Sequence, residues 1–160
     1  MLETEMMMAL EYLRGVAPEE CRRLRAVGIR HTNQFLHMTS LVADRQTVSR
    51  RTGIPEPRLL ELCHQCEMLE VSGMTRHVPV LRRLGIVTVK GLRARDAADL
   101  HARLLSAAGP AGAPTLSEVQ YWISQCRALD IVEEDSGPAA PQVASPSVSA
   151  TTPEATRTAL

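Results

Sequence analysis

The stretch RRLRAVGIRHTNQFL, from Arg22 to Leu36, returns in similar form as PVLRRLGIVTVKGLR, from Pro79 to Arg93. Each copy is typical of a short basic helix that stops at Gly-Ile and leads into a second helix, because a glycine after the last turn is a common helix end. One such copy cannot bury its apolar face alone. We therefore expect two copies to stack and form a core.

The residues that flank the two copies extend the similarity. Gly15 lies 58 residues before Gly73, and the pair Gln65-Cys66 lies 60 residues before Gln125-Cys126. Such small changes in spacing are what loop insertions between repeats produce. The sequence therefore predicts one helical domain over residues 1–132, made of two units at about 10–71 and 72–132.

The composition favours helices over strands. The aromatic residues of the chain are Tyr12, Phe35, Tyr121 and Trp122. Leu, Ala and Val supply most of the apolar side chains, which suits packed helices. A β-sandwich fills its pleated faces with aromatic residues, and a single-stranded nucleic-acid site needs aromatic platforms, so both classes are disfavoured. The prediction is an all-α fold of roughly five to eight helices.

Local signals place these helices along the chain. In the first unit we expect a helix that begins at Pro18 and stops at Gly28, a short helix capped by Thr32, a third over about 42–51 and a fourth from about Pro55. In the second unit we expect a helix capped by Thr75 that ends at Gly85, one over about 97–107 capped by Asp96, and a closing helix opened by Thr115 and Glu118. The signals are a proline at the first helical position, glycine stops and a capping box.

The two ends of the chain differ from its middle. Residues 133–160 are rich in Pro, Ser, Thr and Ala without apolar periodicity, which predicts a disordered tail. The opening stretch MLETEMMMALEYL has no basic region before its apolar residues, unlike a secretory signal, and no stretch has membrane-spanning length. Four cysteines without such a signal predict a reduced, cytoplasmic protein.

The charge is balanced overall but unevenly distributed. The formal net charge is zero, yet residues 20–58 hold 8 arginines against 3 acids, and residues 76–103 hold 7 basic residues against 2 acids. These segments are either solvated helix faces or the contact surface for an anionic partner. The sequence leaves both interpretations open.

The segment VSGMTRHVPVLRRLGIVTVKGLRARDAADL, from Val71 to Leu100, resembles the helix-hairpin-helix superfamily, with RLRAVGIRHTNQFL and RTGIPEPRLLELC (Arg51 to Cys63) in support. Within it, the chain resembles a bacterial family of uncharacterised domains built from two such units. More distantly, the units are similar to the C-terminal domain of the RNA polymerase alpha subunit and to the N-terminal helical domain of recombinases. The resemblance covers most of residues 10–132 and implies tandem helix-hairpin-helix-like repeats whose relatives contact DNA or dock proteins.

The resemblance also implies a Gly-hydrophobic-Gly turn, whose second glycine lets backbone amides approach a phosphate. The corresponding turns here are 15–17 and 73–75, and Ala17 and Thr75 replace that second glycine. This departure puts phosphate contact in doubt, most of all in the first unit, where two acids follow. The candidate nucleic-acid-binding residues are Gly73, Thr75, Arg76, His77, Arg82, Arg83 and Lys90 in the second unit and Gly15, Arg22 and Arg23 in the first.

Other chemistry finds little support. The stretch CHQC could suggest zinc or a redox pair, but a structural zinc site needs four ligands, and Cys63 matches the apolar Ile123 of the other unit. We therefore expect Cys63 and Cys66 to be buried small residues, with no metal, no cofactor, no small-molecule substrate and no catalytic site.

Two functions of different class remain. The first is a non-catalytic module that contacts the backbone of double-stranded nucleic acid, with DNA as its partner and little sequence preference. The alternative is a protein–protein adaptor with degenerate hairpins and no nucleic-acid binding. Neither involves a membrane.

Overall fold

The computed structural model describes residues 8–134. Within this range the chain forms eight α-helices and two short 3-10 helices, and its only β-type pairing is an isolated bridge between Ala9 and His31. The elements are η1 (Leu10–Tyr12), α2 (Pro18–Ala26), α3 (Thr32–Thr39), α4 (Val42–Thr52), α5 (Glu56–Leu69), η2 (Thr75–His77), α6 (Val78–Arg83), α7 (Val89–Arg93), α8 (Ala97–Ala108) and α9 (Leu116–Ala128). The all-α prediction is confirmed for this part of the chain.

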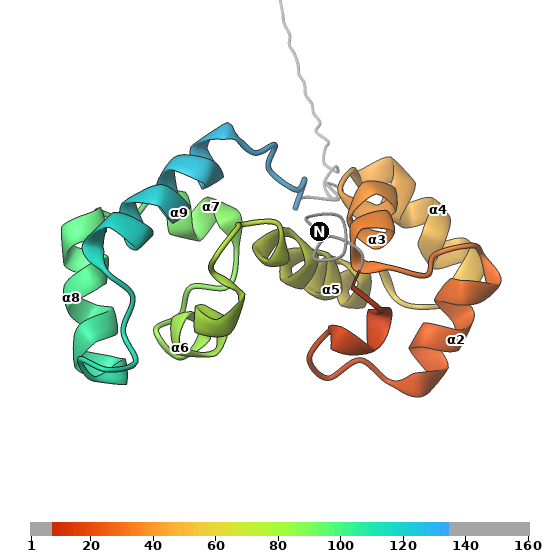
Figure 1. Ribbon diagram of the computed structural model, residues 1–160. Helices are drawn as coiled ribbons and strands as arrows, with labels where there is room; N and C mark the ends of the chain where they lie inside the picture. Colours follow the sequence, from red (N-terminus) through yellow and green to blue (C-terminus); the bar gives the residue numbers. More distant parts are fainter. Residues whose placement is uncertain (1–7, 135–160) are drawn as a thin grey trace, which may run out of the picture.

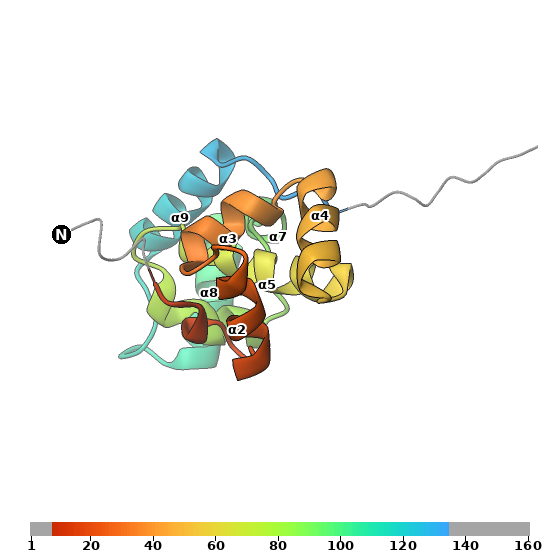
Figure 2. The ribbon, with the colours of Figure 1, turned by 90° about the vertical axis from the view of Figure 1, so that its right-hand side faces the viewer.

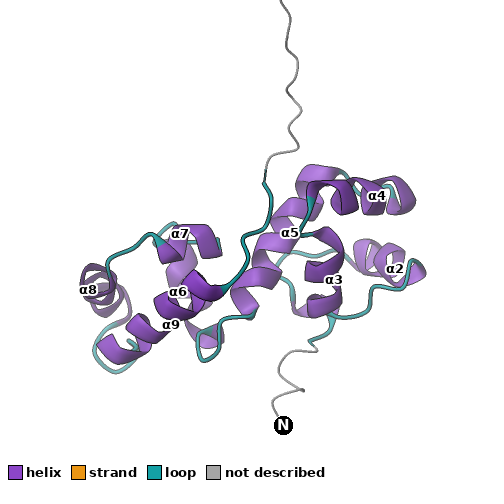
Figure 3. Ribbon diagram, turned by 90° about the horizontal axis from the view of Figure 1, so that it is seen from above, coloured by secondary structure: helices purple, strands orange, loops and turns teal. Residues whose placement is uncertain are grey.

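The helices form two groups, each around its own core (Figure 1). We call η1 to α5 the first lobe and η2 to α9 the second lobe. Phe35 and Leu59 are fully buried in the first core, and Leu81 and Trp122 are buried in the second. Seen from above, the lobes lie side by side and α5 reaches from the first toward the second (Figure 3). Helix α5 joins the lobes because its last turn contributes Met68 to the second core.

Several helix ends lie where local signals predicted them. Helix α2 begins with Pro18, α4 ends at Gly53 in the left-handed region with φ of 77°, and α8 is capped by Asp96, whose side chain accepts from the Asp99 amide. The capping box of α9 is present, because Thr115 and Glu118 each accept the other's backbone N–H, at 2.6 and 3.1 Å. These ends depend on neighbours in sequence, so sequence alone can place them.

Two predicted caps are wrong. Thr32 is the first residue of α3 rather than its cap; its side chain is buried and its backbone N–H donates to the Met8 carbonyl at 2.8 Å. Thr75 makes no capping hydrogen bond and opens the 3-10 turn η2, which continues into the short helix α6. Pro79 explains this break, because it has no N–H to donate to the Thr75 carbonyl as an α-helix requires.

Each lobe contains the same pair of hydrogen bonds between its first turn and its last helix. In the first lobe the Gln65 side chain accepts from the Arg14 amide at 2.8 Å and donates to the Arg14 carbonyl at 3.0 Å. In the second lobe Gln125 does the same with the amide and carbonyl of Ser72, at 2.9 and 3.2 Å. The two glutamines that the sequence comparison matched therefore make matching contacts.

The chain crosses back to the first lobe after α9. Val132 is buried in the first core, and the Glu133 amide donates to the Ser40 carbonyl at 2.8 Å. Figure 2 shows the first lobe from its outer side, with the last described residues reaching it behind α3 and α4. We expected Glu133 and Glu134 in the disordered tail, but both make contacts with the helical part. The rest of that prediction, from residue 135 on, lies outside the described residues.

Candidate functional site

Three of the ten predicted nucleic-acid-binding residues line one groove. Gly15, Thr75 and Arg82 face a space of about 650 Å³ between the lobes. Its lining residues come from α5, from α6 and from the segment that follows η1, and Figure 1 shows where these elements lie. The structure thus joins residues from both hairpins, although they are far apart in sequence.

The walls of the groove are mainly apolar. Tyr12 and Leu13 come from the first lobe, Leu69 from α5, and Val78 and Val87 from the second lobe. Tyr12 and Val87 are 62% and 49% exposed, so the rim is open to solvent. Exposed apolar side chains on the rim of a groove are typical of a surface that binds a partner.

The groove also carries positive charge, for which the described part of the chain supplies no counterion. Arg82 is half-buried, and its pKa is lowered by burial and by the nearby positive charge of Arg14. No carboxylate of the described residues forms an ion pair with Arg82. Glu61 lies at the groove, but it accepts from Arg58 at 2.7 Å. Sequence reasoning missed Arg14, because only the packing of the lobes brings it to Arg82.

The first hairpin is occupied by the protein's own groups. The Ala17 amide donates to Glu20 at 2.9 Å, and Arg58 donates to Glu20 at 2.8 and 2.9 Å and to the Gly15 carbonyl at 2.8 Å. The hydrogen bond from Arg58 holds the pKa of Glu20 below its usual value. A carboxylate thus takes the place where an anion would approach the amide.

The other predicted residues of the first lobe are also paired. Arg22 forms an ion pair with Glu19, and Arg23 donates to the same carboxylate at 2.9 Å. Both arginines are exposed, so such pairs add little to stability. The structure places both at α2 and neither in the groove.

The candidate residues of the second hairpin differ in their exposure to solvent. Gly73 has a φ of 78° and is exposed, whereas His77 is 4% exposed and its ring lies 5.1 Å from that of Trp122. The Arg76 guanidinium donates to the His77 ring at 3.2 Å, and burial, followed by the charge of Arg76, lowers the pKa of His77. His77 is therefore a neutral residue of the second core rather than a surface contact, which corrects the prediction for it.

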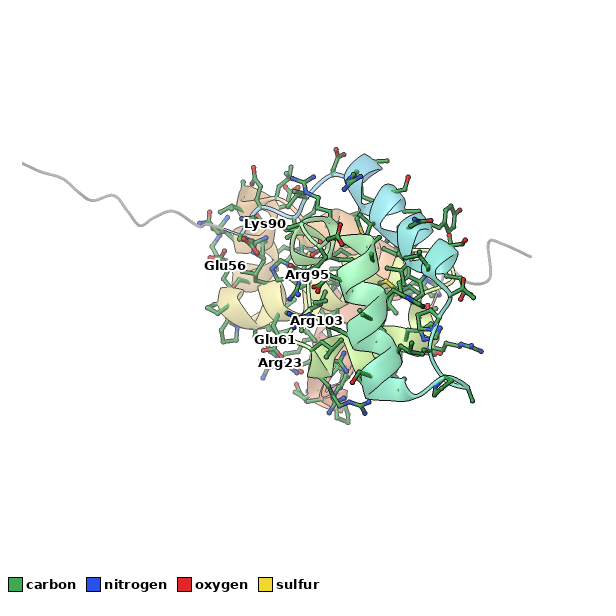
Figure 4. All side chains as sticks on the ribbon, turned by 90° about the vertical axis from the view of Figure 1, so that its left-hand side faces the viewer. Arg23, Glu56, Glu61, Lys90, Arg95 and Arg103 are labelled. Atoms are coloured by element: carbon green, nitrogen blue, oxygen red, sulfur yellow. The ribbon has the colours of Figure 1, made fainter. Side chains whose placement is uncertain are left out.

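The remaining cations of the second lobe lie apart from the groove. Arg83 is exposed at the end of α6. Figure 4 shows Lys90, Arg95 and Arg103 along one side of α8. Two of them have acidic neighbours, because Lys90 lies 3.4 Å from Glu134 and Arg103 lies 3.1 Å from Asp99.

A buried carboxylate links the lobes near this point, and the sequence analysis did not single it out. Glu67 is 3% exposed; it accepts from the Val89 amide at 3.0 Å and lies 2.9 Å from the His64 ring. It therefore caps α7 from α5. The only signal in the sequence is an acid beside the apolar stripe of α5, and such a position does not identify a partner.

The cysteines are buried as the apolar pattern predicted. Cys63 and Cys66 lie in the first core, and burial raises the pKa of Cys63 to about 11 and that of Cys66 well above its ordinary value. A raised pKa keeps these thiols protonated and poorly nucleophilic. Among residues 8–134 no three side chains are grouped so that they could hold a metal ion, and no helix is long and apolar enough to span a bilayer.

Comparison with known proteins gives a family but no named relative. No curated protein and no solved structure matches the chain. The pattern that defines the domain of unknown function DUF4332 matches residues 14–129, which run from the groove residue Arg14 to the end of the second lobe. The chain therefore belongs to the DUF4332 family of domains of unknown function.

Proposed function

We propose that this protein is a non-catalytic adaptor that holds a segment of a partner protein in the groove between its lobes. One observation carries the proposal: an open, mainly apolar groove that both lobes build and that contains two arginines with no counterion among residues 8–134. Apolar walls with a few fixed polar groups are typical of binding sites. The partner would cover the exposed side chains of Tyr12 and Val87.

We further propose that the two lobes are helix-hairpin-helix-like repeats whose turns serve the fold. The matching bonds of Gln65 and Gln125 support a common ancestry of the lobes. In the first lobe the hairpin amide and carbonyl are bonded to Glu20 and Arg58, which supports a structural role for that turn. We also propose that the protein is cytoplasmic, because its four cysteines form no disulfide and free cysteines are typical of a reducing compartment.

A second candidate function is contact with the backbone of double-stranded nucleic acid by the second lobe. It is favoured by the line of Lys90, Arg95 and Arg103 in Figure 4 and by the exposed Arg83. Such contacts neutralise phosphates with little sequence preference. They would use a surface other than the groove, so the two candidates can be tested separately.

The test compares two ligands on the same full-length protein. A displayed library of random short peptides is selected on the protein, and a labelled random-sequence duplex is titrated at two salt concentrations. We expect the variant Tyr12→Ser/Val87→Ser to lose the selected peptides. The matched control Leu105→Ser/Leu116→Ser, exposed apolar residues of α8 and α9, should retain them.

The outcomes separate the two functions. If no peptide is enriched, the adaptor proposal fails. Steep loss of duplex binding with salt, removed by Lys90→Gln/Arg95→Gln/Arg103→Gln but not by Arg22→Gln/Arg23→Gln, would establish the second function.

A further inference from the structure

Arg25 and Arg82 hold the same place in the two lobes. Each lies three residues before a glycine, Gly28 or Gly85, and in both turns the glycine amide donates to the carbonyl of that arginine at 3.0 Å. The two guanidinium groups therefore leave the backbone from corresponding turns, at the ends of α2 and α6.

Only the first of these arginines has a counterion in the described structure. Arg25 donates to both carboxylate oxygens of Glu11, at 2.7 and 2.6 Å, and this bond lowers the pKa of Glu11. Glu11 lies four residues before Gly15. Four residues before Gly73 stands Leu69, an apolar side chain that lines the groove. The second lobe thus keeps the arginine but lacks its carboxylate.

No other acid of residues 8–134 takes over the role of Glu11. Glu61 is bonded to Arg58. Glu70, which follows Leu69, forms no ion pair with Arg82, and its pKa is raised by burial alone. The charge that acts on the pKa of Arg82 is the like charge of Arg14. Two neighbouring cations without a counterion favour the binding of an anion.

We propose that Arg82, with Arg14, binds a glutamate or aspartate carboxylate of the partner segment, as Arg25 binds Glu11 within the first lobe. The inference rests on the proposed adaptor function and names what the groove recognises. A guanidinium pairs with a carboxylate through two parallel hydrogen bonds. The ligand is an acidic peptide in which apolar side chains flank the acid.

The apolar walls favour a peptide over a nucleic acid. Val78, Ile86 and Leu69 line the same groove as Arg82. A nucleic-acid backbone presents phosphates and sugars, which would leave these side chains without an apolar partner. A peptide can offer leucine or aromatic side chains next to its carboxylate, which matches both features of the groove.

The experiment uses the full chain and the selected random-peptide library. We expect the enriched peptides to carry an acid next to leucine or an aromatic residue. Changing that acid to its amide in the synthetic peptide should weaken binding about tenfold or more by fluorescence anisotropy, because hydrogen bonds to charged groups are strong. Arg82→Gln should cause a similar loss, and the neighbouring Arg83→Gln, outside the groove, should not.

A second variant supplies the missing carboxylate. Leu69→Glu places an acid where the first lobe has Glu11, and it should pair with Arg82 and abolish selection for acidic peptides. Thermal unfolding of each variant checks that it folds, and the acid-to-amide change in the peptide tests the inference without any change in the protein.

The contrary results separate a failure of this inference from a failure of the adaptor function. Enriched peptides without an acid would overturn this inference and leave the adaptor function intact, whereas the absence of any enriched peptide overturns both. Duplex DNA that binds and is weakened by Arg82→Gln would assign the site to phosphate and overturn the inference as well.

Discussion

Helices α2 and α6 hold corresponding positions in the two lobes, but their arginines make different contacts. Every arginine of α2, at positions 22, 23 and 25, forms an ion pair with a carboxylate of the first lobe. Neither Arg82 nor Arg83 of α6 does so among the described residues. The same local architecture therefore neutralises its charge in one lobe and leaves it available in the other.

The two hairpin turns differ in the same way as the arginines of α2 and α6. Glu20 and Arg58 occupy the amide and carbonyl of the first turn, whereas the first turn of η2 contains no acid. The first lobe has the bonds of a closed structural unit. Arg82 of the second lobe, which lines the groove, forms no ion pair among the described residues.

The largest expected effect tests whether the two cores form one cooperative unit. Phe35→Ala in the first core and Trp122→Ala in the second should each lower the free energy of unfolding by about 3–5 kcal/mol, because each leaves a cavity. Since α5 contributes to both cores, urea unfolding followed by circular dichroism should show one transition for each variant. The control Tyr121→Ala, at an exposed residue beside Trp122, should change stability by less than about 0.5 kcal/mol. Two separate transitions would show that the lobes are independent.

The next effect concerns the crossing of the chain back to the first lobe. Arg45 is fully buried and donates to the Thr39 carbonyl at 2.8 Å and to the Glu133 carbonyl at 2.7 Å. Arg45→Met should cost about 3 kcal/mol, because it leaves buried acceptors without a donor. Arg50→Met, at an exposed position of the same helix, is the control. Equal stability of the two variants in urea would contradict this role of Arg45.

A pH effect on stability just below pH 6.5 should come from His77 in the second lobe. Burial and Arg76 lower the pKa of His77 from its ordinary value of 6.5. A base with a lowered pKa in the folded state stabilises the fold fully above 6.5, and this contribution is lost as the pH falls toward the folded pKa. We expect His77→Gln to flatten the dependence of stability on pH below 6.5, measured by thermal unfolding across pH. His37→Gln, at an exposed residue of α3, is the matched control.

The smallest effect would make the second lobe resemble the first. In a double-mutant cycle, Leu69→Glu and Arg82→Gln should show a coupling energy of about 0.2–1 kcal/mol, the range for a partly exposed ion pair. The coupling should shrink at high salt. A coupling of zero at low salt would mean that a carboxylate at position 69 does not reach Arg82.

Sequence signals predicted most helix ends but only part of the site. Pro18, Gly53 and the Thr115–Glu118 box act through residues within one turn, so their effects can be read locally. Thr75, Arg76 and His77 looked like a phosphate cradle, but packing of His77 against Trp122 took that ring into the core. The spacing of residues cannot show which side of a turn faces a distant helix.

The sequence by itself determined the helical class, the matching glutamine and glycine positions of the two units and the burial of the cysteines. These follow from periodicity and local hydrogen bonds, which need only neighbours in the chain. Tertiary structure alone decided that Arg14 lies near Arg82, that Arg58 donates to the Gly15 carbonyl of the first hairpin and that Glu133 returns to Arg45. Ion pairs and grooves depend on where distant segments pack, because charges interact through space rather than along the chain.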